Sequence, residues 1–194
     1  MNSICVYCGS APGNDPAFHA EAVAAGTLIA QQGLTLVYGG GRVGLMGTVA
    51  DAVLAEGGRV IGVIPRALAT SEIAHDGLTE LHVVAGMHER KALMARESAG
   101  FLTLPGGVGT FEEFFEILSW AVLGLHRKPI GILNVEGYFD PLLALLDHAA
   151  AERFLRPEHL DRLVVSDRPE ALVADLLAHP PPSTIPRKIE RDET

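Results

Sequence analysis

The chain lacks features that mark several large classes of protein. Its 194 residues contain no apolar run near the about 20 residues that a membrane-spanning helix needs, so we expect no contact with a membrane. No basic and then apolar stretch follows Met1, as it would in a secretory signal peptide, and we therefore expect a cytoplasmic protein. The formal net charge of −9 argues against a nucleic acid as partner, although a single arginine can still bind a phosphate.

Cysteine is scarce, and the usual signatures of metal and nucleotide sites are missing. The two cysteines, Cys5 and Cys8, have no second pair, and the eight histidines lack the spacing of zinc ligands, so we expect no metal site. Because both cysteines lie on or at the end of a predicted strand, we interpret them as core or loop residues rather than as a redox pair. The absence of a Gly-x-x-x-x-Gly-Lys-Ser/Thr sequence argues against a nucleoside triphosphatase.

Apolar segments alternate with segments of helical periodicity along the chain, and 48% of the residues are hydrophobic. The predicted strands are residues 3–8, 34–38, 59–64, 81–84, 101–104, 130–133 and 163–165. The predicted helices are residues 16–32, 45–56, 87–99, 110–123, 141–153 and 169–177. This alternation predicts an α/β fold of three layers, α/β/α, with a central parallel sheet in a single domain over residues 1–179. Residues 180–194, which begin with three prolines, are predicted to form a disordered tail.

Three glycine-bearing segments follow predicted strands, at residues 9–10, 39–41 and 106–109. Because the carboxyl ends of parallel strands meet at one edge of a sheet, we expect these segments to converge on a ligand site there. The polar, irregular segment 66–78 is predicted to form a loop over that site. The glycines at 39–41 follow the second strand and lack a Gly-x-Gly-x-x-Gly spacing with an acidic residue about 20 positions later, so a dinucleotide site is disfavoured.

The densest signal is the segment 104–113, Leu-Pro-Gly-Gly-Val-Gly-Thr-Phe-Glu-Glu, in which a predicted strand leads into a glycine loop and then a helix. The N–H groups at a helix N-terminus bind anions, and glycines let a phosphate approach the backbone. A carboxylate one turn further on then lies within reach of the group that carries the phosphate. The structural alternative is a capping box, with Thr110 as N-cap and Glu113 reaching back to it, while Glu112 complements the helix dipole.

A second charged motif, Met87-His88-Glu89-Arg90-Lys91, opens another predicted helix. Two adjacent cations oppose the helix dipole at that end, which favours a role in binding an anion. Arg90 can hold a phosphate through two parallel hydrogen bonds, and Lys91 can act as a point charge. The alternative is a solvated helix end in which Glu89 pairs with a neighbouring cation.

These two motifs at this spacing resemble the Lonely Guy family of cytokinin-activating phosphoribohydrolases, over about residues 3–155. The resemblance implies a Rossmann-like fold, a homodimer, and cleavage of the N-glycosidic bond of an N6-modified adenosine 5′-monophosphate to the free base and ribose 5-phosphate, with no cofactor. The family's catalytic pair falls on Arg90 and Glu113. The implied substrate-binding positions are Glu72, Arg90, Lys91, Gly106, Gly107, Val108, Gly109, Thr110, Phe111, Glu112 and Ser119, the last of which is threonine in many relatives.

The chemistry of that reaction suits these residues. Breaking an N-glycosidic bond builds positive charge on the ribose, which Glu113 can stabilise while it positions or activates water. We expect Arg90 to hold the phosphate and to keep Glu113 ionised through its opposite charge. Two other functions stay open: a non-catalytic nucleotide or molybdenum-cofactor carrier, which needs the phosphate loop alone, and an assembly protein whose glycines only form turns.

An older name for the family, lysine decarboxylase, predicts a pyridoxal phosphate bound to a lysine. The chain has three lysines, of which Lys91 lies beside the predicted phosphate clamp and Lys128 and Lys188 lie elsewhere. We therefore disfavour that activity.

Overall fold

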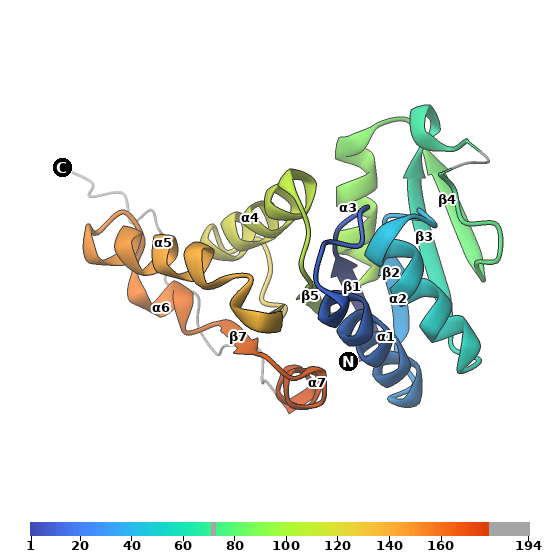
Figure 1. Ribbon diagram of the computed structural model, residues 1–194. Helices are drawn as coiled ribbons and strands as arrows, with labels where there is room; N and C mark the ends of the chain where they lie inside the picture. The colour runs from blue at the N-terminus through green and yellow to red at the C-terminus, as the bar shows by residue number, and fades with distance from the viewer. Residues whose placement is uncertain (71–72, 179–194) are drawn as a thin grey trace.

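Seven parallel strands form the central sheet, in the order β4-β3-β2-β1-β5-β6-β7 (Figure 1). The computed structural model describes residues 1–70 and 73–178. The strands are β1 (Ser3–Tyr7), β2 (Thr35–Tyr38), β3 (Val60–Pro65), β4 (Glu80–Val84), β5 (Phe101–Thr103), β6 (Ile130–Leu133) and β7 (Leu163–Ser166). All seven predicted strands are confirmed, with ends that differ by one residue at most. The predicted tail, residues 180–194, lies outside the described residues.

Helices cover both faces of the sheet, as the alternation predicted. One face carries α1 (Pro16–Gln31), α2 (Gly44–Ala55) and α7 (Pro169–Ala178), and the other carries α3 (Met87–Glu97), α4 (Val108–Val122) and α5 (Asp140–Ala151). The remaining short helices are η1 (Arg66–Leu68), η2 (Val135–Gly137) and α6 (Pro157–Leu160). They were not predicted, because three or four residues are too few to show helical periodicity.

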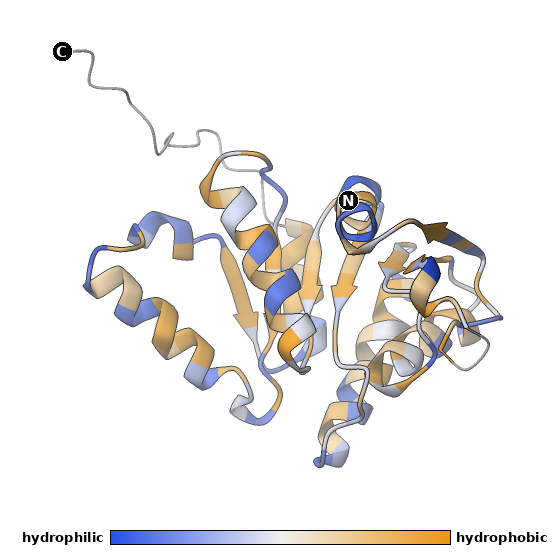
Figure 2. Cartoon of the chain, turned by 90° about the horizontal axis from the view of Figure 1, so that it is seen from above, coloured by the Kyte–Doolittle hydropathy of each residue, from blue (hydrophilic) through white to orange (hydrophobic). Residues whose placement is uncertain are grey.

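The strands are buried on both faces because successive side chains point into two different cores. On β1, Ile4 and Val6 belong to the core under α1, α2 and α7, whereas Cys5 and Tyr7 belong to the core on the opposite face. Figure 2 shows the strands as a hydrophobic layer. Cys5 and Cys8 are both buried and form no disulfide, which confirms that they are core residues, and burial raises the pKa of Cys5 to about 12.

The strand order reverses at β1, which pairs with β2 on one side and with β5 on the other. The chain moves outward from β1 to β4 and then returns to place β5 beside β1. The connections after β1 and β5 therefore leave toward opposite faces of the sheet, and the space between them at the carboxyl edge is where ligands bind in folds of this kind.

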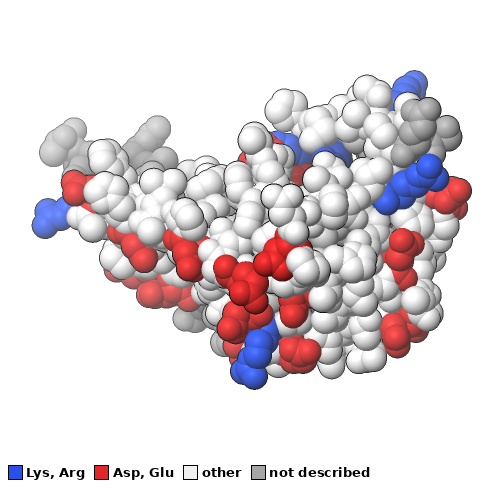
Figure 3. Space-filling view, viewed as in Figure 1, with Lys and Arg blue, Asp and Glu red and all other residues white. Residues whose placement is uncertain are grey.

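The surface seen in Figure 3 carries acidic and uncharged side chains over most of its area, in agreement with the net charge of −9. Four acidic residues lie close together where α1 meets the β6–α5 connection and the start of α7: Glu21, Glu136, Asp167 and Glu170. Burial, together with the other three acids, raises the pKa of Glu21. Within residues 1–70 and 73–178, no helix is long and apolar enough to cross a membrane.

Candidate active site

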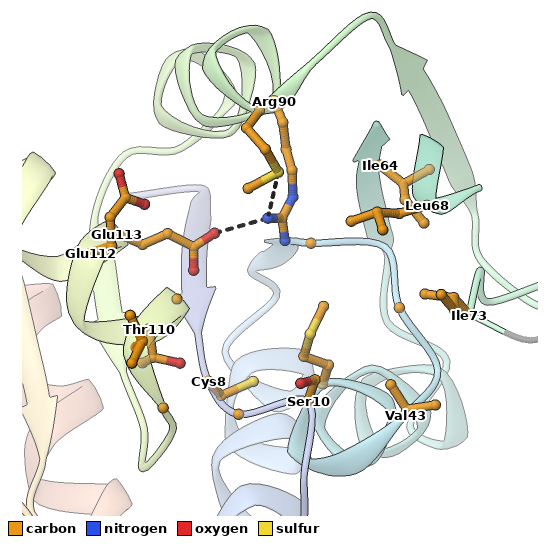
Figure 4. A pocket seen from close by; sticks show the side chains of 18 residues that line it. Cys8, Ser10, Val43, Ile64, Leu68, Ile73, Arg90, Thr110, Glu112 and Glu113 are labelled. Atoms are coloured by element: carbon orange, nitrogen blue, oxygen red, sulfur yellow. Dashed lines mark hydrogen bonds and ion pairs between the residues drawn. The ribbon is translucent and has the colours of Figure 1, made fainter. Parts of the chain in front are cut away.

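A cavity of about 460 Å³ lies at the carboxyl ends of β1, β2, β3 and β5, where the strand order reverses. Its wall contains Gly9 after β1, Gly39 and Gly41 after β2, and Gly107 and Gly109 before and in α4. The predicted convergence of three glycine-bearing segments on one edge of the sheet is therefore confirmed. The same wall contains charged side chains from both motifs, namely Arg90, Glu112 and Glu113, in the arrangement that Figure 4 shows.

The helix α4 begins closer to the glycines than the sequence predicted. Gly107 is the N-cap and Val108 the first helical residue, so Thr110 lies inside the first turn, where it is buried. No side chain caps the helix, and the capping-box alternative is therefore wrong. Glycine is required at position 106, because a Cβ there would lie 2.1 Å from Thr110 Oγ1 and 2.7 Å from the Gly9 nitrogen. The N–H groups of the first turn of α4 are left for a ligand.

Arg90 and Glu113 meet in the wall of this cavity. Nη1 of Arg90 lies 3.2 Å from Oε1 of Glu113, and the two side chains are 11% and 9% exposed (Figure 4). The guanidinium is oriented by its Nε, which donates a hydrogen bond to the carbonyl of Val63 at 3.1 Å. It also lies against Gly39, where a Cβ would approach Nη2 to 1.9 Å. The arginine at the start of α3 and the carboxylate of α4 therefore share one pocket.

The charge state of Glu113 differs from the prediction. Burial raises the pKa of Glu113 from 4.5 to about 7, and the opposing effect of Arg90 is smaller. Arg90 thus limits the rise without keeping the carboxylate fully ionised near neutral pH, which corrects the expectation from charge pairing alone. Oε1 of Glu113 is buried and accepts no hydrogen bond from the described residues, because the contact with Arg90 is an ion pair without hydrogen-bond geometry.

Lys91 binds the carboxylates of α4. Its Nζ donates a short hydrogen bond to Glu112 and lies 3.0 Å from Oε1 of Glu116, and its side chain is 7% exposed. Burial alone lowers the pKa of Lys91, but the two carboxylates raise it above its ordinary value. Glu116 was missed in the sequence, although its spacing of four from Glu112 places both on one helix face. Lys91 is not part of the cavity wall, so its predicted contact with substrate stays a prediction.

The other predicted site residues fall into three groups. The cavity that Arg90 and Glu113 line is also lined by Gly107, Val108, Gly109, Thr110 and Glu112. Gly106 lines a smaller cavity of about 250 Å³ beside it, which also contains Gly107. Neither cavity wall contains Phe111 or the exposed Ser119, so their roles also stay predictions, and Glu72 lies outside the described residues.

An apolar wall faces the charged pair across the cavity (Figure 4). It comes from Val43 before α2, Ile64 at the end of β3, Leu68 of η1, and Ile73. Ile73 belongs to the predicted loop 66–78, and its carbonyl accepts a hydrogen bond from the Arg42 nitrogen at 2.9 Å. Since Leu68 and Ile73 line the cavity, the described part of this loop lies at the site as predicted. Sequence analysis missed these residues because single apolar residues from separate segments form no motif.

Solved structures share this fold at low sequence identity. A molybdenum cofactor binding protein from the phototrophic bacterium Rippkaea orientalis gives a TM-score of 0.70 at 21% identity, over 92% of this chain and 96% of that chain. The molybdenum cofactor carrier protein of Chlamydomonas reinhardtii gives 0.69 at 23% identity, over 92% of this chain and 99% of that chain. These structures confirm the predicted α/β fold and are too distant in sequence to indicate the function.

Sequence relatives are much closer. A protein of Rhodococcoides fascians named cytokinin riboside 5′-monophosphate phosphoribohydrolase is 52% identical over 173 residues, which are 89% of this chain and 87% of the relative. The protein of Oryza sativa subsp. japonica named cytokinin riboside 5′-monophosphate phosphoribohydrolase LOG is 48% identical over 163 residues, 84% of this chain and 67% of the relative. A family model described as "Possible lysine decarboxylase" matches residues 46–176, which include both charged motifs. The chain therefore belongs to the Lonely Guy (LOG) family.

Proposed function

We propose that this protein hydrolyses the N-glycosidic bond of adenosine 5′-monophosphate and its N6-modified forms, and releases the free base and ribose 5-phosphate. The observation that carries the proposal is the Arg90–Glu113 pair, with 3.2 Å between Nη1 and Oε1, in the wall of one cavity beside the N-terminus of α4. Relatives that are 48% and 52% identical over most of this chain bear the name of a phosphoribohydrolase.

The phosphate of such a substrate suits the glycine loop and Arg90. The first turn of α4, from Val108 to Thr110, places unpaired N–H groups at the cavity, and the guanidinium of Arg90 supplies a positive charge. A phosphate held there fixes the position of the ribose. The binding energy of a group that does not react then serves to orient the bond that breaks.

Glu113 is placed to assist a water molecule. In the step that we propose, a water oxygen forms a bond to C1′ of the ribose while the bond from C1′ to N9 breaks and its electron pair goes to the base. The ionised carboxylate stabilises the positive charge on the ribose and accepts a proton from the water, and the base takes up a proton as it leaves. The carboxyl group of Glu113 belongs to the cavity wall beside the N-terminus of α4, so a water molecule held next to the ribose can approach it.

The apolar wall suits a flat base with an alkyl substituent. Ile64, Leu68 and Ile73 lie in the cavity wall opposite the charged pair, so a purine whose ribose lies over Glu113 extends toward them. We expect an isopentenyl group on N6 to raise kcat/KM over that of AMP by at least about tenfold, since burial of about two of its carbon atoms already has an effect of this size.

Release of free base from a panel of nucleoside 5′-monophosphates tests the proposal directly. The base is separated by chromatography after incubation with AMP, isopentenyl-AMP and other monophosphates, and adenosine serves as the control without phosphate. We expect release from the adenine nucleotides and a rate at least about 100-fold lower from adenosine, because the phosphate orients the ribose. Binding of these nucleotides without release of any base would overturn the hydrolase and favour the carrier.

The homodimer and the cytoplasmic location belong to the same proposal. Leu123 and Leu125, just after α4, are 52% and 69% exposed, and exposed apolar side chains of this kind support an interface with a second copy. Sedimentation equilibrium tests the dimer, and fractionation of the source cells tests the location.

A further inference from the structure

The connection between β6 and α5 holds an unusual backbone conformation next to the glycine loop. Glu136 in this connection has a φ of 49°, a left-handed conformation that side chains other than glycine rarely adopt. The connection is fastened by Asn134, whose Oδ1 accepts a hydrogen bond from the Phe139 nitrogen at 2.7 Å and whose Nδ2 donates one to Asp140 at 2.8 Å. A strained and tightly held turn thus presents the residue between Gly137 and Phe139.

That residue is Tyr138, and its hydroxyl donates a hydrogen bond of 2.5 Å to the carbonyl of Gly106. The ring packs edge-on against Phe18, with centroids 5.5 Å apart, and stacks on Phe111 at 6.5 Å. Tyr138 and Gly106 both line the smaller cavity of about 250 Å³, and the wall of the main cavity does not contain Tyr138. The tyrosine therefore contacts the back of the glycine loop.

The hydrogen bond fixes a peptide plane that would otherwise turn easily. Gly106 and Gly107 flank this plane, and a glycine on each side gives it wide conformational freedom. No peptide bond of the described residues is cis, so the C=O of Gly106 and the N–H of Gly107 point in opposite directions. Because the carbonyl of Gly106 is bound to Tyr138, the N–H of Gly107, the N-cap of α4, points away from the tyrosine. The preceding carbonyl, of Pro105, is held in turn by the Gly9 nitrogen at 3.0 Å.

We infer that Tyr138 is a positioning residue for the phosphate site: it holds the Gly106 carbonyl so that the N–H of Gly107 stays directed to the anion. The inference rests on the proposed function, in which the loop before α4 binds the phosphate of the substrate. Tyr138 acts through the backbone and touches neither the ribose nor the base. Its hydroxyl therefore governs affinity for ligands that carry a phosphate, and the breaking of the glycosidic bond proceeds without it.

Tyr138→Phe tests the inference, because it removes the hydroxyl and keeps the ring in its aromatic contacts. We expect the KM for AMP and the Kd for ribose 5-phosphate, measured by calorimetry, to rise about five- to tenfold, the effect of losing one hydrogen bond, while kcat changes less than about twofold. The matched control is Tyr38→Phe, since the hydroxyl of Tyr38 is buried and has no hydrogen-bond partner among the described residues. It should leave KM and Kd unchanged.

The outcomes separate this inference from the proposed function. If the wild-type protein releases base and Tyr138→Phe has the wild-type KM and Kd, the inference fails and the hydrolase stands. If Tyr138→Phe lowers only the melting temperature, or lowers kcat as strongly as it raises KM, the residue is structural and the inference also fails. If the wild-type protein binds ribose 5-phosphate but releases no base, the hydrolase fails, and weaker binding by Tyr138→Phe still supports the inference. A wild-type protein that neither binds ribose 5-phosphate nor releases base from AMP overturns both.

Discussion

Two ion-pair sites lie side by side between α3 and α4, and they differ in how completely their charges are satisfied. Lys91 is bound by two carboxylates, Glu112 and Glu116, and is not among the residues that line the cavity. Its neighbour Arg90 faces one carboxylate, Glu113, whose Oε1 lacks a hydrogen bond from the described residues. Adjacent helical residues point in directions about 100° apart, so the two cations serve different purposes. The ion pairs of Lys91 with Glu112 and Glu116 hold α3 and α4 together, whereas the Arg90–Glu113 pair lines the cavity and can bind a ligand.

Glu113→Gln gives the sharpest test of this difference. The amide keeps the volume of the side chain and can neither carry the negative charge nor accept a proton from water, so we expect kcat for base release to fall about 10³-fold. The measurement is the rate of base release from AMP at saturating concentration. Glu152→Gln, at an exposed position after α5, is the matched control and should stay within about twofold of the wild type. More than a tenth of wild-type activity in Glu113→Gln would remove this residue from the reaction.

Arg90→Gln should have the next largest effect. It removes the cation from the phosphate site and the positive charge that lowers the pKa of Glu113, so we expect kcat/KM to fall about 100-fold. The acidic limb of the pH profile of kcat/KM should also move above the pKa of about 7 that Glu113 has beside the arginine. Arg96→Gln, on the exposed face of the same helix, serves as control. An unchanged acidic limb would mean that another group titrates in the profile.

Lys91→Met tests whether the ion pairs of Lys91 with Glu112 and Glu116 stabilise the fold rather than bind substrate. It leaves the carboxylates of Glu112 and Glu116, which are 50% and 23% exposed, one helical turn apart without a cation, so we expect the free energy of unfolding to fall by about 1 kcal/mol in denaturant titrations. The value of kcat/KM should stay within about tenfold of the wild type. If instead KM for AMP rises more than about a hundredfold while the free energy of unfolding is unchanged, Lys91 contacts the substrate, as the family resemblance implied.

The comparison of the two sites also shows what the sequence can reveal. Buried strands and long amphipathic helices were predicted to within two residues at each end, because their periodicity repeats over several turns or alternations. Both catalytic candidates were found because they lie in dense local motifs. The partner of Lys91 and the protonation of Glu113 depend on the distance between two helices and on the depth of burial, which no local pattern encodes. The same holds for Tyr138, which is distant in the sequence from the loop that it contacts.

The raised pKa of Glu113 should also be visible in the pH dependence of stability. The folded protein holds the Glu113 proton up to a pH of about 7, whereas the unfolded chain releases it near 4.5. Between these values the folded state binds more protons, so the free energy of unfolding falls as the pH rises. From pH 5 to pH 7 this contribution amounts to about 2 kcal/mol.

The variant Glu113→Gln tests this contribution, because its side chain has no proton to release. Its free energy of unfolding relative to that of the wild type should therefore increase by about 2 kcal/mol from pH 5 to pH 7. The measurement is a denaturant titration at each pH. Glu152→Gln, at the exposed position after α5, keeps Glu113 and its charged neighbours and should retain the wild-type slope. If the free energies of unfolding of Glu113→Gln and of the wild type instead change in parallel from pH 5 to pH 7, Glu113 is ionised throughout this range. Its negative charge is then compensated as well as the charge of Lys91 is, contrary to the difference that the geometry indicates.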